Sequence, residues 1–418
     1  MLAADVAGGV TTFFTMAYIV VVNPGILAAP GTGMAFSGVL TATVLVAAAM
    51  TLLMGVYARL PFAVAPGMGL NAFFAYTIVL QNKVPWQVAL GMVFWAGVLF
   101  LLVSATPLRE RIAMAIPPPI RTGAAAGIGL LLTLLGLRNG GLIQADPTTL
   151  LRVGPLGHRA AFLLLGLVLA AALMRRRNPL AFLASIFVVT GLAWTFGYAQ
   201  VPAQVVSAPD FHSVFLRLDP LGALQLSLLP SILAILFTDL FDSLSTFIGV
   251  ANAAQLTDRD RRPINLRRGL IVDALATLTA GLAGTSSGTA FVESVAGIRM
   301  GGRRGRASVV TALCFLPCFF IAPLAAAVPD FATAAVLILV GLAMFQTVGT
   351  LDFRSLEDSV PAFVTVVLIP LTLSITQGIL WGFLLHALLY AIAGRAREVS
   401  PALWALAALS AVFLALEY

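Results

Sequence analysis

The stretch that decides the fold reads LPFAVAPGMGLNAFFAYTIVL at residues 60–80, and a second stretch of the same kind reads GTSSGTAFVESVAGIRMGG at residues 284–302. Both are largely apolar, but Pro66 and Gly67 interrupt the first, and Gly288, after two serines, interrupts the second. Proline lacks the backbone N–H of a helix interior, and glycine loses more conformational freedom there than any other residue. We therefore expect two short, broken helices at these places.

The composition of the whole chain places these stretches in a membrane. Of 418 residues, 60% are apolar and 10% are charged, and the mean hydropathy is +1.02. A soluble domain is roughly 45–50% apolar and 25% charged, and a disordered chain needs high charge with low hydrophobicity, so both classes are excluded. Because a spanning helix needs about 20 apolar residues, the chain has room for about 14 transmembrane segments and for no soluble domain. The sequence predicts an all-α polytopic membrane protein, and this composition excludes an ordinary globular enzyme.

The sequence is divided into fourteen predicted spans. They are 6–27, 36–58, 64–80, 85–105, 119–137, 159–174, 179–197, 226–250, 266–284, 286–298, 307–328, 332–350, 361–376 and 378–394. A further apolar stretch, 401–417, is short for a span, and we expect it to lie along the membrane surface or to pack on the bundle.

Basic residues test this map. The net charge of +7 would suggest a nucleic-acid partner only if the basic residues formed one patch, and here they are scattered in short clusters between spans. With a cytoplasmic N-terminus and C-terminus, 19 of the 24 basic residues fall on the cytoplasmic side, as the positive-inside rule requires. The five on the other side are Lys83, Arg138, Arg152, Arg159 and Arg217. We predict a multi-pass protein of the cell membrane with this orientation.

Fourteen spans divide into seven and seven. Because seven is odd, the second half begins on the opposite side of the membrane from the first, which makes an inverted repeat. The broken spans 64–80 and 286–298 then hold the same place in each half. Paired interrupted spans are typical of a transporter binding site, because their free N–H groups and positive dipole ends lie at mid-membrane. The alternative is that both are re-entrant helices that only pack.

Four acidic residues lie inside apolar runs: Asp239, Asp242, Asp273 and Glu293. A charge at the bilayer centre costs about 2.5–3.5 kcal/mol even on lenient scales. No basic residue lies at the same depth in the sequence map to neutralise them. These carboxyl groups are therefore protonated at rest or face a wet cavity, and both conditions suit a proton-coupled site. Asp242, Glu293 and Asp273 are the candidates for proton coupling.

The roles of these acids remain open between binding and structure. For Asp242 and Glu293 we favour contact with a ligand over a buried structural hydrogen bond. Asp239 and Asp242 share one helix face at i,i+3, so one of the two could bond only to backbone or to a neighbouring helix. Asp273, among small residues, either ties helices together or relays protons.

Further candidate substrate-binding residues lie in the broken spans and in the first span. Asn71 offers both a donor and an acceptor, although capping of the broken helix is its structural alternative. Thr15 carries a hydroxyl in the first span, where such groups usually bond to their own helix. Phe73 and Phe291 could stack on a flat ligand or only pack, and Ser294 follows Glu293 directly. The three histidines, His158, His212 and His386, show no ligand spacing, so we expect no metal.

Several runs together resemble a known family. They are TTFFTMAYIVVVNPGIL, PFAVAPGMGLNAFFAYTIVL followed by WQVALG, FTDLFDSLSTFIGVA, and GTSSGTAFVESVAGI followed by GGRRGRASVV. In these runs the chain resembles the adenine–guanine–hypoxanthine permease branch of the second nucleobase–cation symporter family, also called nucleobase–ascorbate transporters. The resemblance extends from the first span to about residue 400, nearly the whole chain.

The resemblance implies a fold and an activity. It implies core regions at 1–105 and 226–328, gate regions at 106–225 and 329–418, and short strands in the two broken spans that meet near mid-membrane. It further implies uptake of adenine, guanine or hypoxanthine with protons across the plasma membrane, no cofactor other than the coupling proton, and homodimers. By position, the base-binding acids are Asp242 and Glu293.

Two positions depart from the pattern of that branch. Ser245 stands where glycine is usual, and Thr289-Ala290-Phe291 stands where the approach to the glutamate is rich in Thr and Tyr, so the preferred purine stays open.

Other functions remain as alternatives. A uracil or xanthine transporter of the same family is the nearest alternative. An anion exchanger of related fold should carry a basic group at the breaks. An intramembrane aspartyl protease needs aspartates on separate helices in YD and GxGD contexts, and a channel needs a repeated polar stripe, neither of which the sequence provides.

Overall fold

The computed structural model describes residues 2–106, 116–257 and 264–417. Helices dominate this part of the chain, and eight of them are long and apolar enough to cross a membrane, with four shorter apolar helices beside them. This confirms the prediction of an all-α, multi-pass membrane fold. Five arginines assigned to the cytoplasmic side lie outside the described residues: Arg109, Arg111, Arg259, Arg261 and Arg262.

The first half of the chain is built from helices, with one short strand in the broken span and two further strands between later helices. Its elements are α1 (Leu2–Met16), α2 (Ile19–Leu27), α3 (Phe36–Leu53), the π-helical turn η1 (Met54–Ala58), β1 (Val64–Pro66), α4 (Met68–Ala72), the π-helical η2 (Phe73–Gln81), α5 (Trp86–Ala105), α7 (Pro118–Asn139), β2 (Ile143–Asp146), β3 (Leu150–Val153), α8 (His158–Arg175) and α9 (Ala181–Thr195).

The second half repeats the order of helix, helix, strand, short helix and helix. Its elements are the 3₁₀ turns η3 (Gly222–Leu224) and η4 (Leu226–Leu228), α10 (Leu229–Ala254), α11 (Leu266–Ala283), β4 (Gly288–Ala290), α12 (Ser294–Arg299), α13 (Gly305–Phe315), η5 (Leu316–Phe320), α14 (Ala322–Ala326), α15 (Asp330–Phe345), η6 (Gln346–Thr350), α16 (Leu356–Thr372), α17 (Ile375–Ile392), η7 (Ala396–Glu398) and α18 (Pro401–Glu417).

The two broken spans meet, as expected, in a two-stranded antiparallel sheet. Strand β1 pairs with β4 in the register Val64↔Ala290, Ala65↔Thr289 and Pro66↔Gly288. Only glycine fits at position 288, because a Cβ there would lie 2.8 Å from the Cβ of Ala276 on α11. The sheet therefore joins the two halves of the chain inside the bundle.

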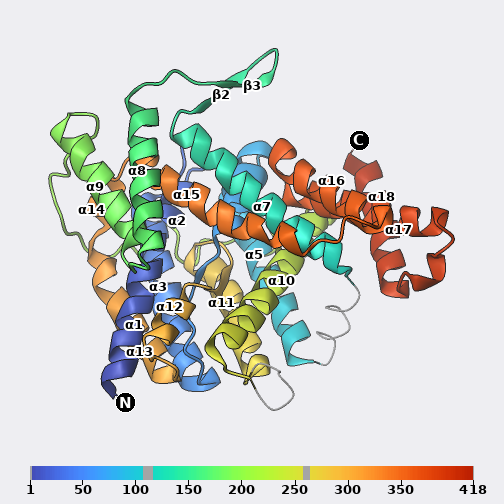
Figure 1. The fold of residues 1–418 in the computed structure, drawn as a ribbon, viewed down its shortest axis with the longest axis horizontal. Coiled ribbons are helices and arrows are strands. Elements are labelled where there is room, and N and C mark those ends of the chain that lie inside the picture. The colour runs from blue at the N-terminus through green and yellow to red at the C-terminus, as the bar shows by residue number, and fades with distance from the viewer. Residues whose placement is uncertain (1, 107–115, 258–263, 418) are drawn as a thin grey trace.

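The helices pack in two groups. In the first, α1 packs on α12 and α13, α3 on α11 and α13, and α5 on α10 and α11. In the second, α7 packs on α15 and α16, and α16 on α17 (Figure 1). Small residues bring α7 and α15 together, since a Cβ on Gly341 would lie 2.4 Å from the carbonyl oxygen of Gly129.

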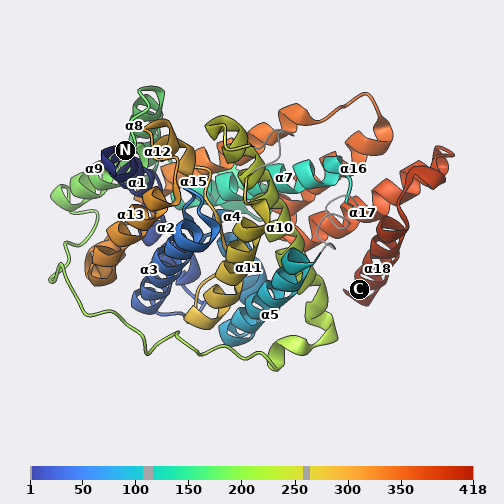
Figure 2. The ribbon, with the colours of Figure 1, turned by 90° about the horizontal axis from the view of Figure 1, so that it is seen from below.

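Two local features differ from the sequence prediction, and a third, the long connection at 198–225, was already left between the predicted spans. The span predicted at 6–27 is divided into α1 and α2 by a turn at Ala17 and Tyr18. The connection between α7 and α8 forms the β2–β3 hairpin, which projects from the bundle (Figure 1). The segment between α9 and α10 runs as a long connection across one side of the molecule (Figure 2). The first of these differences shapes the site.

Candidate functional site

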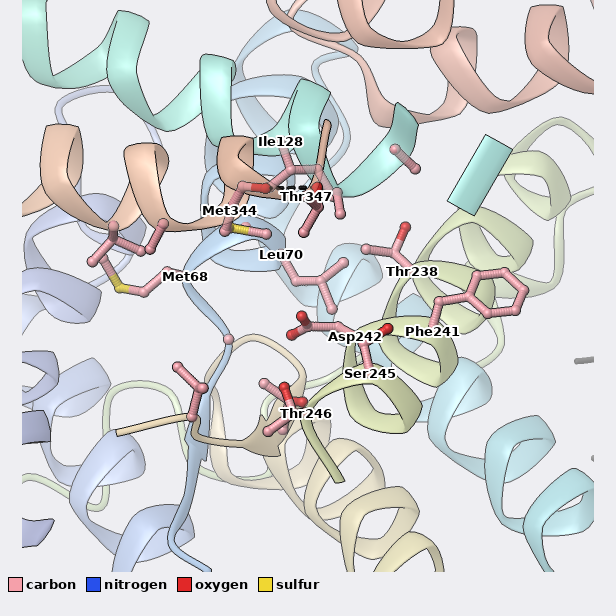
Figure 3. Close-up of a pocket in the computed structure, with 18 of the residues that line it drawn as sticks. Met68, Leu70, Ile128, Thr238, Phe241, Asp242, Ser245, Thr246, Met344 and Thr347 are labelled. Atoms are coloured by element: carbon pink, nitrogen blue, oxygen red, sulfur yellow. Dashed lines mark hydrogen bonds between the residues drawn. The ribbon is translucent and has the colours of Figure 1, made fainter. Parts of the chain in front are cut away.

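One cavity of about 480 Å³ lies where the broken spans meet the second helix group. Its walls come from the β1–α4 junction, α7, α10, the β4–α12 segment, α15 and α17. In Figure 3 the carboxylate of Asp242 points into this cavity, with Leu70, Met344 and Thr347 around the same space. The volume is within the range of about 300–1,000 Å³ that small-molecule sites occupy.

Three of the predicted site residues line the cavity together. They are Asp242 on α10, Phe291 after β4, and Glu293 at the N-cap of α12. Ser245 and Thr289, where the chain departs from the branch pattern, also line it. The carboxylate oxygens of Asp242 point into the cavity, where a ligand can reach them.

Glu293 is held by a residue that the sequence analysis did not single out. The phenol of Tyr18 donates a hydrogen bond of 2.7 Å to Oε1 of Glu293. Tyr18 is buried and packs edge-to-face on Phe182, with ring centroids 5.0 Å apart. Tyr18 lies in the turn between α1 and α2, so the break in the first span places its ring at the cavity. A tyrosine within an apolar run carries no sequence signal of its own.

Asp239 and Asp273 lie behind the cavity wall, fully buried. Oδ2 of Asp239 accepts hydrogen bonds from the hydroxyls of Ser287 (2.5 Å) and Thr277, and Asp273 accepts one from Ser243. The other carboxylate oxygen of each aspartate has no partner among the described residues. These contacts tie α10 and α11 to the segment around β4. Neither aspartate lines the cavity.

Asn71 does not line the cavity but belongs to a buried network in which Asn23 joins the first half of the chain to the second. Asn71 is fully buried on α4, and its amide donates a hydrogen bond of 3.1 Å to Oδ1 of Asn23. Asn23 in turn donates to the hydroxyls of Thr43 (2.8 Å) and Thr285 (2.9 Å). Asn23 is a polar residue that directly precedes a proline within the first predicted span, and this pattern could have marked it as a candidate for a buried hydrogen-bond network.

The remaining candidates make structural contacts. Thr15 donates to carbonyl oxygens of its own helix, at 3.0 and 2.8 Å. Ser294 donates to the carbonyl of Phe291 (2.7 Å) and accepts from the N–H of Ala63 (3.0 Å), which fixes α12 against β1. Phe73 is fully buried in the apolar core. None of these three lines the cavity.

The geometry can bind a flat, polar-edged molecule. Two carboxyl groups from α10 and α12 face a space bounded by the aromatic rings of Phe182, Phe241 and Phe383. Carboxylates accept hydrogen bonds from N–H groups, and charge-assisted bonds of this kind are the strong ones. Within residues 2–106, 116–257 and 264–417, no group of three metal-ligating side chains is found.

Comparison with known proteins identifies the family. The sequence profile of the Permease family matches residues 4–381. The chain is 40% identical to the adenine permease AdeP of Escherichia coli (strain K12), over 95% of this chain and 89% of that protein. It is 37% identical to the guanine/hypoxanthine permease PbuG of Bacillus subtilis (strain 168), over 96% of this chain and 94% of that protein.

A solved structure has the same fold. The transmembrane domain of a cyanobacterium bicarbonate transporter, BicA, superposes with a TM-score of 0.66 at 18% identity, covering 91% of this chain and 96% of that domain. With a family profile over most of its length and relatives of this identity, the chain belongs to the Permease family, in the branch of the adenine and guanine/hypoxanthine permeases, and it is a permease rather than an enzyme.

Proposed function

We propose that this chain takes up purine nucleobases with protons across the cell membrane. The observation that carries the proposal is the meeting of Asp242 and Glu293 in one cavity beside the paired strands of the two broken spans. The permeases of adenine and of guanine/hypoxanthine that the chain resembles support a purine as the substrate.

The substrate lies between the broken spans and the second helix group. Glu293, oriented by Tyr18, accepts ring or exocyclic N–H hydrogens of the base. Asp242 engages another edge, and the rings of Phe182, Phe241 and Phe383 supply apolar faces for the flat base. Binding by hydrogen bonds to a planar edge explains how the site can prefer a base over other small molecules.

The coupling proton is carried by a carboxyl group of the same site. Asp242 and Glu293 face the cavity, and the pair Asp239 and Asp273 lies directly behind it. A carboxylate facing a low-dielectric space favours its protonated form, so loading of the base and of the proton depend on each other. Asp273, in contact with Ser243 on α10, is the candidate that would pass a proton away from the cavity.

Transport follows from motion of one helix group against the other. The group α7, α15, α16 and α17 corresponds to the proposed gate, and the group α1, α3, α5, α10, α11 and α13 to the proposed core. The cavity extends to Arg121 at the start of α7, Met174 at the end of α8 and Gly249 near the end of α10. In the proposed orientation these helix ends face the cytoplasm, which matches an inward-facing state with both termini inside.

The test is uptake of tritiated adenine, guanine, hypoxanthine, xanthine and uracil in a host that lacks nucleobase transporters, with and without a protonophore. We expect purine uptake that the protonophore abolishes. Glu293→Gln and Asp242→Asn should lose uptake while remaining in the membrane, whereas Asp352→Asn, in a loop outside the cavity, should not. Full uptake by both site variants would remove this assignment, and uptake of uracil alone would favour the alternative substrate.

A further inference from the structure

Arg121 is the only basic residue among the described residues that line the cavity. It lies in the first turn of α7 (Pro118–Asn139) and lines the same cavity as Asp242 on α10 and Glu293 on α12. The sequence analysis used it only as one of the cytoplasmic arginines. Its place in the cavity gives it a chemical role that the two acids cannot fill.

The guanidinium of Arg121 has unused hydrogen-bonding capacity. Its Nε is buried and has no hydrogen-bond partner among the described residues. The guanidinium carbon lies 5.7 Å from the ring centroid of Phe241, the residue directly before Asp242. An aromatic face orients the planar group but takes none of its N–H donors. A buried N–H without an acceptor is costly, so a ligand that offers acceptors at this wall is favoured.

The cavity therefore presents two opposite kinds of recognition. Carboxylates accept, so Asp242 and Glu293 select the edges of a base that carry N–H groups. A guanidinium only donates, in a rigid fork that suits two acceptors side by side. A 6-oxopurine carries such a pair, O6 and N7, on one edge, whereas adenine offers N7 beside an amino group that is itself a donor.

We propose that Arg121 is a specificity-determining residue that donates paired hydrogen bonds to the O6 and N7 edge of a 6-oxopurine. The carrier then prefers hypoxanthine and guanine to adenine. This inference rests on the proposed function, because it assigns the substrate class of that same cavity. Arginine paired with O6 and N7 gives a discrimination of roughly 5- to 150-fold against the wrong base in protein–DNA recognition, and an effect of this order is expected here.

The test is competition in proteoliposomes that contain the purified protein. Uptake of tritiated hypoxanthine is measured against unlabelled hypoxanthine, adenine and 7-deazahypoxanthine, which keeps O6 but has no N7 acceptor. Wild type should favour hypoxanthine over both competitors by at least about fivefold. Arg121→Gln should weaken hypoxanthine most, 7-deazahypoxanthine less because it loses only the bond to O6, and adenine least, so that the three half-inhibitory concentrations converge.

Two further variants separate recognition from charge and from folding. Arg121→Lys keeps the positive charge but cannot form the fork, so it should also lose most of the preference. Arg138→Gln, on the last turn of the same helix and outside the cavity, should keep the wild-type ratios.

The outcomes are distinct. A wild type that favours adenine, an Arg121→Gln variant that weakens all three competitors equally, or an Arg121→Lys variant that keeps the full preference would each overturn this role for Arg121. Absence of any purine uptake by wild type would instead overturn the proposed function.

Discussion

The phenol of Tyr18 and the carboxylate of Glu293 are 275 residues apart in the sequence and 2.7 Å apart in the fold. The bond links the turn between α1 and α2 to the N-cap of α12. A residue of the first half of the chain therefore orients a proposed substrate-binding residue of the second half. Tyr18 is thus a positioning residue for Glu293.

Removal of that hydroxyl should weaken transport without unfolding the protein. A hydrogen bond to a charged group contributes about 1.5–3 kcal/mol, so Tyr18→Phe should lower purine affinity by roughly 10- to 150-fold if Glu293 is ionised in the binding state. The measurement is the concentration dependence of uptake at several pH values. Tyr198→Phe, whose ring stacks on His158 away from the cavity, is the matched control. Equal affinities for Tyr18→Phe and wild type would show that Tyr18 does not position Glu293.

The hydroxyl of Thr277 should matter for stability. It donates to Asp239, contacts Ser287 at 2.8 Å and lies 3.0 Å from the carbonyl oxygen of Gly288. Thr277→Val leaves buried polar atoms unsatisfied, which costs about 1–3 kcal/mol. We expect a lower midpoint of thermal unfolding in detergent.

Thr279→Val is the matched control for this change, two residues along the same helix. Its hydroxyl bonds only to carbonyls of its own helix, Leu275 at 2.7 Å and Ala276 at 3.1 Å. That variant should unfold close to the wild-type temperature. If both variants lose the same stability, the buried network around Asp239 contributes nothing beyond a generic loss of hydroxyl groups.

The contact of α7 with α15 should not tolerate a methyl group. A Cβ on Gly341 would lie 2.4 Å from the carbonyl oxygen of Gly129, which is backbone and cannot swing away. Gly341→Ala should therefore destabilise the fold by about 1–3 kcal/mol and reduce uptake, because both helices wall the cavity. Gly191→Ala on α9, where a Cβ would meet nothing within 4 Å, should be neutral or slightly stabilising. A Gly341→Ala variant as stable as Gly191→Ala would contradict the close packing.

Asp210 should make the long connection between α9 and α10 sensitive to acid. Partial burial opposes ionisation of Asp210, but hydrogen bonds from the hydroxyls of Ser213 (2.7 Å) and Ser37 (2.8 Å) and from the N–H groups of His212 and Ser213 outweigh it. Together they lower the pKa of Asp210 from 3.8 to about 2.

Because this pKa is lower in the folded state, the carboxylate contributes stability above about pH 4, and the contribution is lost as the pH falls toward 2. The gap in unfolding temperature between wild type and Asp210→Asn should be wide at pH 6 and should narrow below pH 4. A gap that is constant from pH 6 to pH 3 would exclude this role for the charge. Asp352→Asn, whose carboxylate accepts one backbone N–H, from Arg354, serves as the control.

The sequence predicted the parts of the site that depend on local chemistry. Proline and glycine are unfavourable in a helix interior, so Pro66, Gly67 and Gly288 indicated where the two spans are interrupted. The unusual position of Asp242 and Glu293 at lipid depth marked them as candidates. The pairing of β1 with β4 followed only from the family resemblance, and the structure confirms it.

The residues that sequence reasoning missed depend on tertiary packing. Tyr18 reaches Glu293 because the chain turns between α1 and α2, and no local pattern of the first 27 residues encodes which helix that ring will meet. Arg121 fits the positive-inside pattern as well as any loop arginine, and only the packing of α7 against α10 brings it to the cavity. Asp239 and Asp242 share a helix face in the sequence, yet one lies behind the wall and the other in front of it.

The β1–β4 pairing has a consequence for how the protein is made. Strand β1 ends at residue 66 and its partner β4 begins at residue 288, so 221 residues are synthesised between them. At about 5–20 residues per second, that interval lasts roughly 10–45 s. For that time the nascent first half holds unmatched amide groups that lipid cannot satisfy. During biogenesis, the insertion machinery, or water that it admits, must therefore satisfy the backbone amide groups of β1 until β4 has been synthesised.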